Sequence, residues 1–301
     1  MSTFAVIDLG TNTFHLLVIE IDSQGEWSPV YKQREHVRLA ENGIGQISEE
    51  AFNRGIKTLE VFSEKMKKLG VEKIQAFGTA ALRNATNSSV FLQEAKDKSG
   101  IEVQVINGVQ EAQYIYKGVR QAVKMKESPC LIMDIGGGSV EFIIANAQTI
   151  FWAQSYPIGV AVLYKKFHRN EPITDLELKE LHYFLAHHLG GLKDQLDQYE
   201  IECLIGASGT FDILYNLVHG PRDLEREPLP ISKVSIQSLA DRFRLLGLEQ
   251  RLQLEDIPKQ RAEYIVVAME LLIYIIDLSQ IGDILVSPYA MKEGIIVDKW
   301  D

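Results

Sequence analysis

The residues best suited to chemistry lie around three consecutive glycines. The stretch, placed between two apolar runs, reads Asp134, Ile135, Gly136, Gly137, Gly138, Ser139, Val140 and Glu141. It predicts a strand, a tight turn and an antiparallel strand. Backbone N–H groups in such a turn can surround a phosphate, and two carboxylates beside a phosphate call for a cation, for which Mg²⁺ is the natural candidate. The alternative is an ordinary glycine-rich hairpin with two surface acids.

The start of the chain repeats this pattern. An apolar run ends at Asp8, a turn of small and hydroxyl residues follows, and a second apolar run begins at Phe14. The turn residues are Gly10, Thr11, Asn12 and Thr13. Two copies of one pattern predict a duplicated domain, with a phosphate-binding hairpin in each half. We expect domains at residues 1–126 and 127–301, divided within a charged segment.

Other candidate residues lie at the ends of predicted strands. Arg83 follows the Gly78-Thr79 step after the predicted strand 73–77, where ligands of α/β folds tend to bind. It can pair bidentately with phosphate, although a surface arginine is the default. The turn at Ser208 and Gly209 opens a predicted helix and can contact a phosphate chain.

Glu111 lies in the first turn of a helix predicted to begin near residue 107. An acid in this position can simply complement the helix dipole, which contributes up to about 1 kcal/mol. The functional interpretation is a general base that faces the cleft. The residues alone do not decide between an acid that complements the helix dipole and a general base.

Composition and charge indicate a globular protein and give no support for nucleic-acid binding. The 301 residues have an ordinary globular composition and a formal net charge of −10, which gives no support for nucleic-acid binding. Cys130 and Cys203 each lie in an apolar run and are expected to be buried thiols in a reducing compartment. Asp8 interrupts the first apolar run, and the apolar segment 264–276 is too short to span a bilayer. We therefore expect a cytoplasmic protein with no membrane partner.

Taken in order, these motifs resemble the exopolyphosphatase/guanosine pentaphosphate phosphatase (Ppx/GppA) family of the actin/hexokinase/Hsp70 superfamily. The resemblance covers essentially the whole chain and rests on residues 7–15, 78–83, 108–112, 134–141 and 157–159. It implies an α/β fold of two ribonuclease-H-like domains, each with a mixed five-stranded sheet flanked by helices, and a cleft between them. The chain looks like the short, two-domain form of the family.

The resemblance also assigns roles to residues. It implies that Glu111 activates water, that Asp134 and Glu141 serve the metal and the phosphate loop, and that Arg83 contacts phosphate. The backbone donors fall on Gly10–Thr13 and Gly136–Ser139. The sequence departs from the family pattern at Val140, which replaces a Thr, and at Lys292, which begins Lys-Glu-Gly in place of Arg-Glu-Gly.

From this resemblance we expect an exopolyphosphatase that releases orthophosphate from inorganic polyphosphate with Mg²⁺, or with Mn²⁺ as the alternative metal. The nearest rival is a guanosine pentaphosphate 5′-phosphohydrolase, in which His15 and Arg261 would contact the guanosine or its extra phosphates. A kinase of the same superfamily and a non-catalytic sensor of guanosine penta- or tetraphosphate or of polyphosphate are further alternatives. The sequence leaves a homodimer open.

Overall fold

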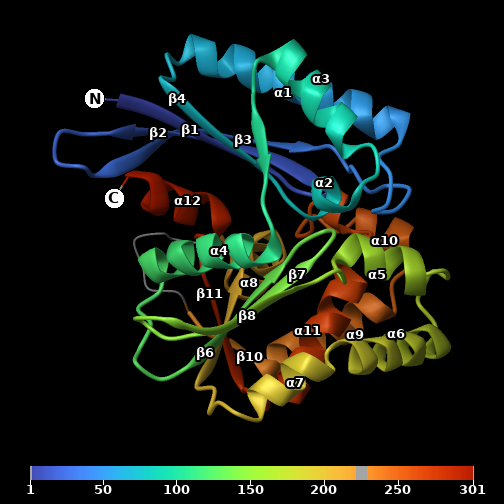
Figure 1. The fold of residues 1–301 in the computed structure, drawn as a ribbon. Coiled ribbons are helices and arrows are strands. Elements are labelled where there is room, and N and C mark those ends of the chain that lie inside the picture. Colours follow the sequence, from blue (N-terminus) through green and yellow to red (C-terminus); the bar gives the residue numbers. More distant parts are fainter. Residues whose placement is uncertain (1, 222–228, 301) are drawn as a thin grey trace.

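The first half of the chain folds around a mixed sheet. The computed structural model describes residues 2–221 and 229–300. The strand order of the first sheet is β3-β2-β1-β4-β5, with β1 antiparallel to β2 and parallel to β4 (Figure 1). Its strands are β1 (Ser2–Leu9), β2 (Thr13–Ile21), β3 (Trp27–His36), β4 (Lys73–Gly78) and β5 (Val103–Val105).

The second half folds around a similar sheet of order β10-β11-β9-β6-β7-β8. Its strands are β6 (Cys130–Ile135), β7 (Val140–Ala145), β8 (Ile150–Tyr156), β9 (Cys203–Ala207), β10 (Ile231–Ser232) and β11 (Asp283–Val286). Strands β8, β7, β6, β9 and β11 follow the order and directions of β3, β2, β1, β4 and β5. This common topology confirms the predicted duplication, and β10 adds a sixth strand at one edge.

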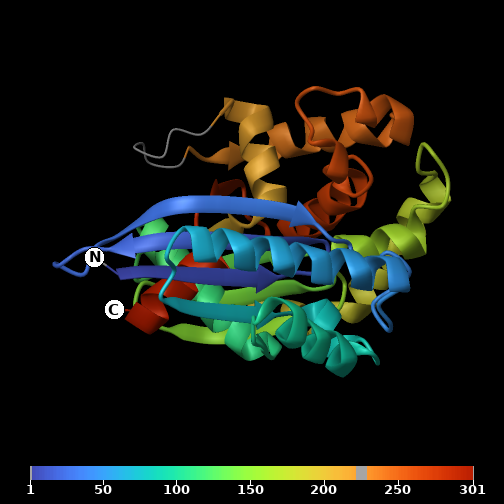
Figure 2. The ribbon, with the colours of Figure 1, turned by 90° about the horizontal axis from the view of Figure 1, so that it is seen from above.

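The helices form layers on both sides of the sheets (Figure 1). Seen from above, α1 runs along the strands of the first sheet (Figure 2). The helices are α1 (Glu49–Lys68), α2 (Ala80–Asn84), α3 (Ser88–Ser99), α4 (Gly108–Ala122), α5 (Val160–Phe167), α6 (Asp175–His188), α7 (Gly190–Leu196), α8 (Gly209–His219), α9 (Lys233–Arg244), α10 (Leu248–Leu252), the 3₁₀ turn η1 (Lys259–Arg261), α11 (Ile265–Ser279) and α12 (Met291–Trp300).

Three apolar cores hold these layers together. One lies between the first sheet and α1 and α3, and another joins the second sheet to the helices on its outer face, including α11. The third core lies between the two sheets, where α4 and α12 pack against each other and against both β1 and β7. The two halves of the chain therefore share one apolar layer, and this layer leads to the ends of β1 and β6.

Local signals explain why the helices begin where they do. Ser48 caps α1 by accepting a hydrogen bond from the N–H of Ala51. Asn107 and Gln110 form a capping box at the start of α4. That cap places Glu111 in the first turn of α4, at the end nearest to the glycine hairpins.

Two expectations about cellular context can be compared with the structure. Cys130 and Cys203 are both free thiols, one buried and one partly exposed. Of the helices in residues 2–221 and 229–300, none combines the length and apolar character needed to cross a membrane.

Candidate active site

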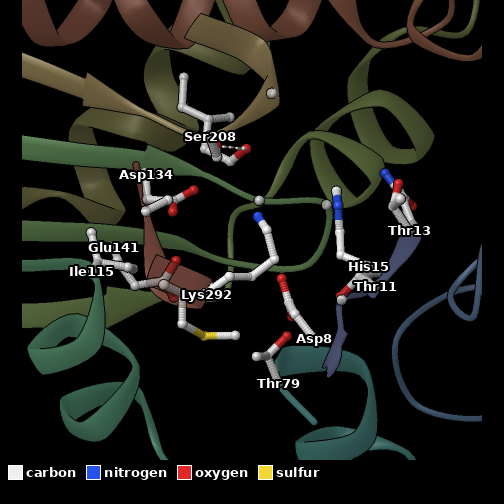
Figure 3. Close-up of a pocket in the computed structure, with 18 of the residues that line it drawn as sticks. Asp8, Thr11, Thr13, His15, Thr79, Ile115, Asp134, Glu141, Ser208 and Lys292 are labelled. Carbon is white, nitrogen blue, oxygen red and sulfur yellow. Dashed lines mark hydrogen bonds between the residues drawn. The ribbon is translucent and has the colours of Figure 1, made fainter. Parts of the chain in front are cut away.

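The two glycine hairpins meet at a cavity of about 140 Å³ between the halves of the chain (Figure 3). Every predicted site residue except Arg83 lines this cavity. The predicted residues that line it are Asp8, Gly10, Thr11, Asn12, Thr13, Glu111, Asp134, Gly136, Gly137, Gly138, Ser139, Glu141, Ser208 and Gly209. The fold therefore brings together motifs that are far apart in the sequence.

The hairpins place their polar side chains in equivalent positions. Asp134 pairs in register with Glu141 across β6 and β7, and Asp8 pairs in the same way with His15 across β1 and β2. Residues paired across an antiparallel ladder project to the same face of the sheet. The second hairpin thus presents two carboxylates to the cavity, whereas the first presents a carboxylate and an imidazole.

The turn of the second hairpin is held from outside by the first turn of α5. Gly136 N–H donates to the Ser139 carbonyl at 3.0 Å, which closes the turn. The carbonyls of Gly136 and Gly137 accept from the N–H groups of Val160 at 3.0 Å and Ala161 at 2.9 Å. Because a trans peptide directs its N–H opposite to its C=O, the N–H groups of Gly137 and Gly138 point away from α5. They are available to an anion in the cavity.

The first hairpin is held in a comparable way by the segment after β3. Gly10 N–H donates to the Thr13 carbonyl at 3.1 Å. The Thr11 carbonyl accepts from Leu39 N–H at 2.8 Å, and the Asn12 carbonyl accepts from Arg38 N–H at 3.0 Å. Both turns therefore have their carbonyls engaged on the outside, which leaves their N–H groups to face inward.

Glycine allows the two turns to come into contact. A Cβ on Gly137 would lie 2.6 Å from Asn12 Nδ2 of the other turn. At the start of α5, a Cβ on Gly159 would lie 2.4 Å from the Gly137 carbonyl oxygen. Thr11 Oγ1 and Asn12 Nδ2 are buried and have no hydrogen-bond partner within the described part of the chain. Buried donors are rarely left unpaired, so these two atoms are suited to a bound oxyanion.

The carboxylates of the second hairpin are buried beside each other. Burial raises the pKa of Asp134 to about 8, and the neighbouring charge of Glu141 adds to this effect. Burial also raises the pKa of Glu141, although its Oε1 accepts hydrogen bonds from Ser139 at 2.7 Å and Ser155 at 2.6 Å. Burial raises the pKa of Asp8 to about 6. Burial is the main cause of all three upward shifts.

The donor set suits a hard divalent cation. Oxygen ligands are those that Mg²⁺ prefers, and Mg²⁺ commonly takes only one or two carboxylates together with water and substrate phosphate. Asp134 and Glu141 offer such a pair. In residues 2–221 and 229–300, no group of three or more His, Cys, Asp or Glu side chains is arranged to hold a metal by itself. The residues therefore fit a metal that shares its coordination with a phosphate.

Glu111 reaches the cavity from the first turn of α4 and is 7% exposed. Its carboxylate pairs with Arg83, with 3.0 Å between Nη1 and Oε2. Burial raises its pKa well above the usual range, the charge of Glu141 adds to this, and Arg83 opposes it. A carboxylate with a raised pKa is a better proton acceptor near neutral pH.

Arg83 occupies a different place from the one that the family resemblance implies. Besides Glu111, it donates to the Ile106 carbonyl at 2.8 Å. It does not belong to the lining of the cavity. In this structure it pairs with Glu111 and opposes the upward shift of the Glu111 pKa, and its contact with phosphate stays a prediction.

Several lining residues were missed or only touched on from the sequence. Arg34 and Asp212 carried no signal in the sequence, whereas Thr79 and Glu293 appeared there only as members of the Gly78-Thr79 step and of the Lys-Glu-Gly segment. His15 and Arg261, which were considered only as contacts for guanosine, also line the cavity. Lys292 lies there as well, and its only signal was its place at the start of the Lys-Glu-Gly segment.

Comparisons with solved structures agree with this architecture. An exopolyphosphatase from Cytophaga hutchinsonii is 34% identical, with a TM-score of 0.95, and the match covers 100% of this chain and 98% of that one. A PPX-GPPA enzyme from Aquifex aeolicus is 25% identical, with a TM-score of 0.82 and 99% of both chains covered. Both structures share the fold of this chain over almost its full length.

Sequence comparison also finds relatives over nearly the whole chain. A guanosine-5′-triphosphate,3′-diphosphate pyrophosphatase from Photobacterium profundum is 29% identical over 300 residues, which is 98% of this chain. The chain spans 59% of the length of that relative. The model of the Ppx/GppA phosphatase family matches residues 17–301. Because this match covers nearly the whole chain and includes Glu111 and the Lys292 segment, the chain belongs to the Ppx/GppA phosphatase family.

Proposed function

We propose that this protein is an exopolyphosphatase that hydrolyses the terminal phosphoanhydride of inorganic polyphosphate and releases orthophosphate. The observation that carries the proposal is the convergence of two N–H-rich turns, two paired carboxylates and a buried glutamate on one cavity. Phosphoryl transfer depends mainly on positioning and on charge stabilisation. The cavity supplies both.

The turns would bind the terminal phosphoryl group. The N–H groups of Gly137 and Gly138 and the unpaired atoms Thr11 Oγ1 and Asn12 Nδ2 are the donors nearest to such a group. Donors that are fixed before the substrate arrives need no reorganisation during the reaction. Contact between the hairpins keeps these donors at a constant spacing.

Glu111 would orient the attacking water and accept its proton. The oxygen of this water forms a bond to phosphorus while the bond to the bridging oxygen breaks, and the shortened chain leaves with the bonding electrons. The guanidinium group of Arg83 forms an ion pair with the carboxylate of Glu111. A positioned base contributes on the order of 10²–10⁴-fold to the rate.

Asp134 and Glu141 would hold Mg²⁺ or Mn²⁺, each through oxygen atoms and partly through water. When bound, the metal neutralises charge on the phosphoryl oxygens. Glu141 is oriented for this role because Ser139 and Ser155 donate to its Oε1. Asp134 lies beside it in register.

A linear phosphate chain suits the charges beyond the turns. The guanidinium groups of Arg34 and Arg261 line the same cavity. These two cationic groups can contact further phosphates of a polyphosphate chain. The Cytophaga hutchinsonii structure, similar along its whole length, is named an exopolyphosphatase.

The second candidate is hydrolysis of the 5′-γ-phosphate of guanosine pentaphosphate with the same groups. It is favoured by the similarity to the Photobacterium profundum pyrophosphatase. In this case His15 and Arg261 would contact the guanosine or its extra phosphates. A sensor without catalysis would bind either compound and would have no use for a base at Glu111.

The deciding experiment measures orthophosphate release with Mg²⁺ from long-chain polyphosphate and, separately, from guanosine pentaphosphate. We expect release from polyphosphate, and we expect Glu111→Gln to lower kcat by about 10²-fold or more while substrate still binds. Removal of the metal with EDTA should stop release, and added Mg²⁺ should restore it. Glu64→Gln, an exposed position on α1, serves as the matched control and should retain wild-type activity.

Each other outcome has a clear meaning. Release from guanosine pentaphosphate alone would replace the first proposal by the second. Binding of either compound without release, by folded wild-type protein, would support the sensor. Full activity of Glu111→Gln would contradict the assignment of the base.

A further inference from the structure

Lys292 enters the cavity from the first turn of α12. Figure 3 shows its side chain in the middle of the site, with Asp134 and Glu141 on one side and Asp8 and Thr11 on the other. Glu293, the next residue of the Lys-Glu-Gly segment, also lines the cavity. The position of Lys292 is central to both halves of the site.

The backbone that carries Lys292 is held rigidly. Glu293 Oε2 accepts a hydrogen bond from the N–H of Ala290 at 3.0 Å, which fixes the start of α12. A Cβ on Gly294 would lie 1.7 Å from the Tyr114 carbonyl oxygen, so α12 and α4 are in direct backbone contact. Since α4 also carries Glu111, the lysine and the proposed base belong to one packed unit.

Lys292 carries a positive charge that no neighbour neutralises by direct contact. Within residues 2–221 and 229–300, its Nζ forms no ion pair or hydrogen bond. Burial lowers its pKa, but the charges of Glu293 and Asp8 more than offset this, so the pKa is raised overall and the ammonium group persists at neutral pH. Its charge also lowers the pKa values of Asp8, Asp134 and His15.

Two arginines in the second half of the chain, one half-buried and one buried, form direct ion pairs outside the site. Arg244 contacts Glu270 with 2.8 Å between Nη2 and Oε2. Arg251 contacts Glu171 with 2.9 Å between Nη2 and Oε1. A lysine needed only to balance the acids of the site would gain most from a direct ion pair of this kind. Lys292 instead directs its ammonium group into the cavity.

We propose that Lys292 is a catalytic residue whose ammonium group contacts the non-bridging oxygens of the transferred phosphoryl group and stabilises their charge in the transition state. This inference rests on the proposed phosphohydrolase function. Lys292 stays protonated throughout, because the proton of the attacking water passes to Glu111. Three rotatable donors on a compact cation suit a group whose oxygens shift during in-line attack.

The test compares Lys292→Met with Lys299→Met in the presence of Mg²⁺. Lys299 lies on the same helix and pairs with Asp298 at 2.9 Å, so it controls for the loss of a lysine from α12. For Lys292→Met we expect kcat on polyphosphate to fall by about 10²-fold or more, the loss typical of one transition-state donor, while KM changes little. Orthovanadate, which mimics the transferred group, should bind at least about 10-fold more weakly. Lys299→Met should match wild type, and Lys292→Arg should recover most of the lost activity.

Two results would contradict a catalytic role for Lys292. If folded Lys292→Met keeps kcat and orthovanadate affinity close to wild type, the role of Lys292 is overturned. A role limited to charge balance would lower the melting temperature of the variant and leave its kcat unchanged.

If Lys292→Met does not fold, the wild-type protein provides the measurement. Orthovanadate with Mg²⁺ should protect Lys292, but not Lys299, from reductive methylation detected by mass spectrometry. Equal modification of Lys292 with and without orthovanadate would overturn the inference. Absence of hydrolysis by wild type would count against the proposed function, and the orthovanadate measurement would still decide the contact with Lys292.

Discussion

At the scale of single residues, the pairing of Arg83 with Glu111 bears on the role of the arginine and on the pKa of the glutamate. The family resemblance assigns Arg83 to phosphate, whereas its guanidinium contacts the carboxylate of the proposed base at 3.0 Å. Arg83 lowers the pKa of Glu111, against the burial and the Glu141 charge that raise it. The arginine therefore lowers the pH above which Glu111 can accept a proton.

Arg83→Met should raise the pKa of Glu111 further. Because the base works only when deprotonated, kcat should fall at neutral pH and recover as the pH rises. The acid limb of the kcat–pH profile should move upward by roughly 1–3 pH units, the range produced by an adjacent arginine. The control is Arg120→Met on α4, the helix that carries Glu111, since Arg120 lies over the Tyr116 ring and not in the site. A loss of kcat that is equal at every pH would show that Arg83 acts on the substrate instead.

At the scale of elements, the two hairpins act as matched halves of one anion site. Each turn is closed by an N–H to C=O hydrogen bond between equivalent residues, Gly10 to Thr13 and Gly136 to Ser139. Each has its outer carbonyls bonded to the segment that follows the third strand of its sheet. The contact of α5 with the second turn depends on the absence of a side chain at Gly159.

Gly159→Ala should therefore disturb the second turn. The new Cβ would meet the backbone of Gly137 at 2.4 Å, and overpacking against backbone typically costs about 1–3 kcal/mol. We expect a lower free energy of unfolding in urea and a loss of phosphate release. Gly190→Ala is the matched control, because a Cβ there meets nothing within 4 Å. Wild-type stability of Gly159→Ala would contradict the close approach of α5 to the turn.

At the scale of the whole molecule, the site exists only where the halves meet. Besides the shared layer of α4 and α12, the halves are connected by an ion pair between Arg38 and Glu263, with 2.9 Å between Nη2 and Oε2. Lys165 of the second half also donates to the Asn42 carbonyl of the first. The duplication is not symmetric in chemistry, because His15 in the first hairpin matches Glu141 in the second.

A ligand in the cavity should thus protect both halves at once. Orthovanadate with Mg²⁺ is expected to slow amide hydrogen exchange in residues 10–13 and in residues 136–139, because N–H groups of both turns would bind the same anion. Amides in the middle of α6 provide the internal control and should exchange at the same rate with and without the ligand. Protection confined to one hairpin would show that the other turn does not bind the anion.

Much of the candidate site could be predicted from the sequence because its parts are local. A strand, an aspartate and a turn of small residues form a hairpin through short-range geometry. The sequence therefore predicts Asp8, Asp134 and Glu141 at the ends of strands without any knowledge of tertiary contacts. The helix predicted to begin near residue 107 likewise has Glu111 in its first turn, as the structure confirms.

Tertiary structure decided what those residues face. Strand β10 spans only Ile231–Ser232, too short for an alternating pattern, and forms because β11 offers an open edge. The partner of Arg83 and the direction of Lys292 depend on how α4 and α12 pack between the sheets. The sequence by itself determined the hairpins, the duplication and the acids of the site, since these follow from neighbours along the chain. Which charges meet in the cavity was decided only by packing, because it depends on residues far apart in sequence.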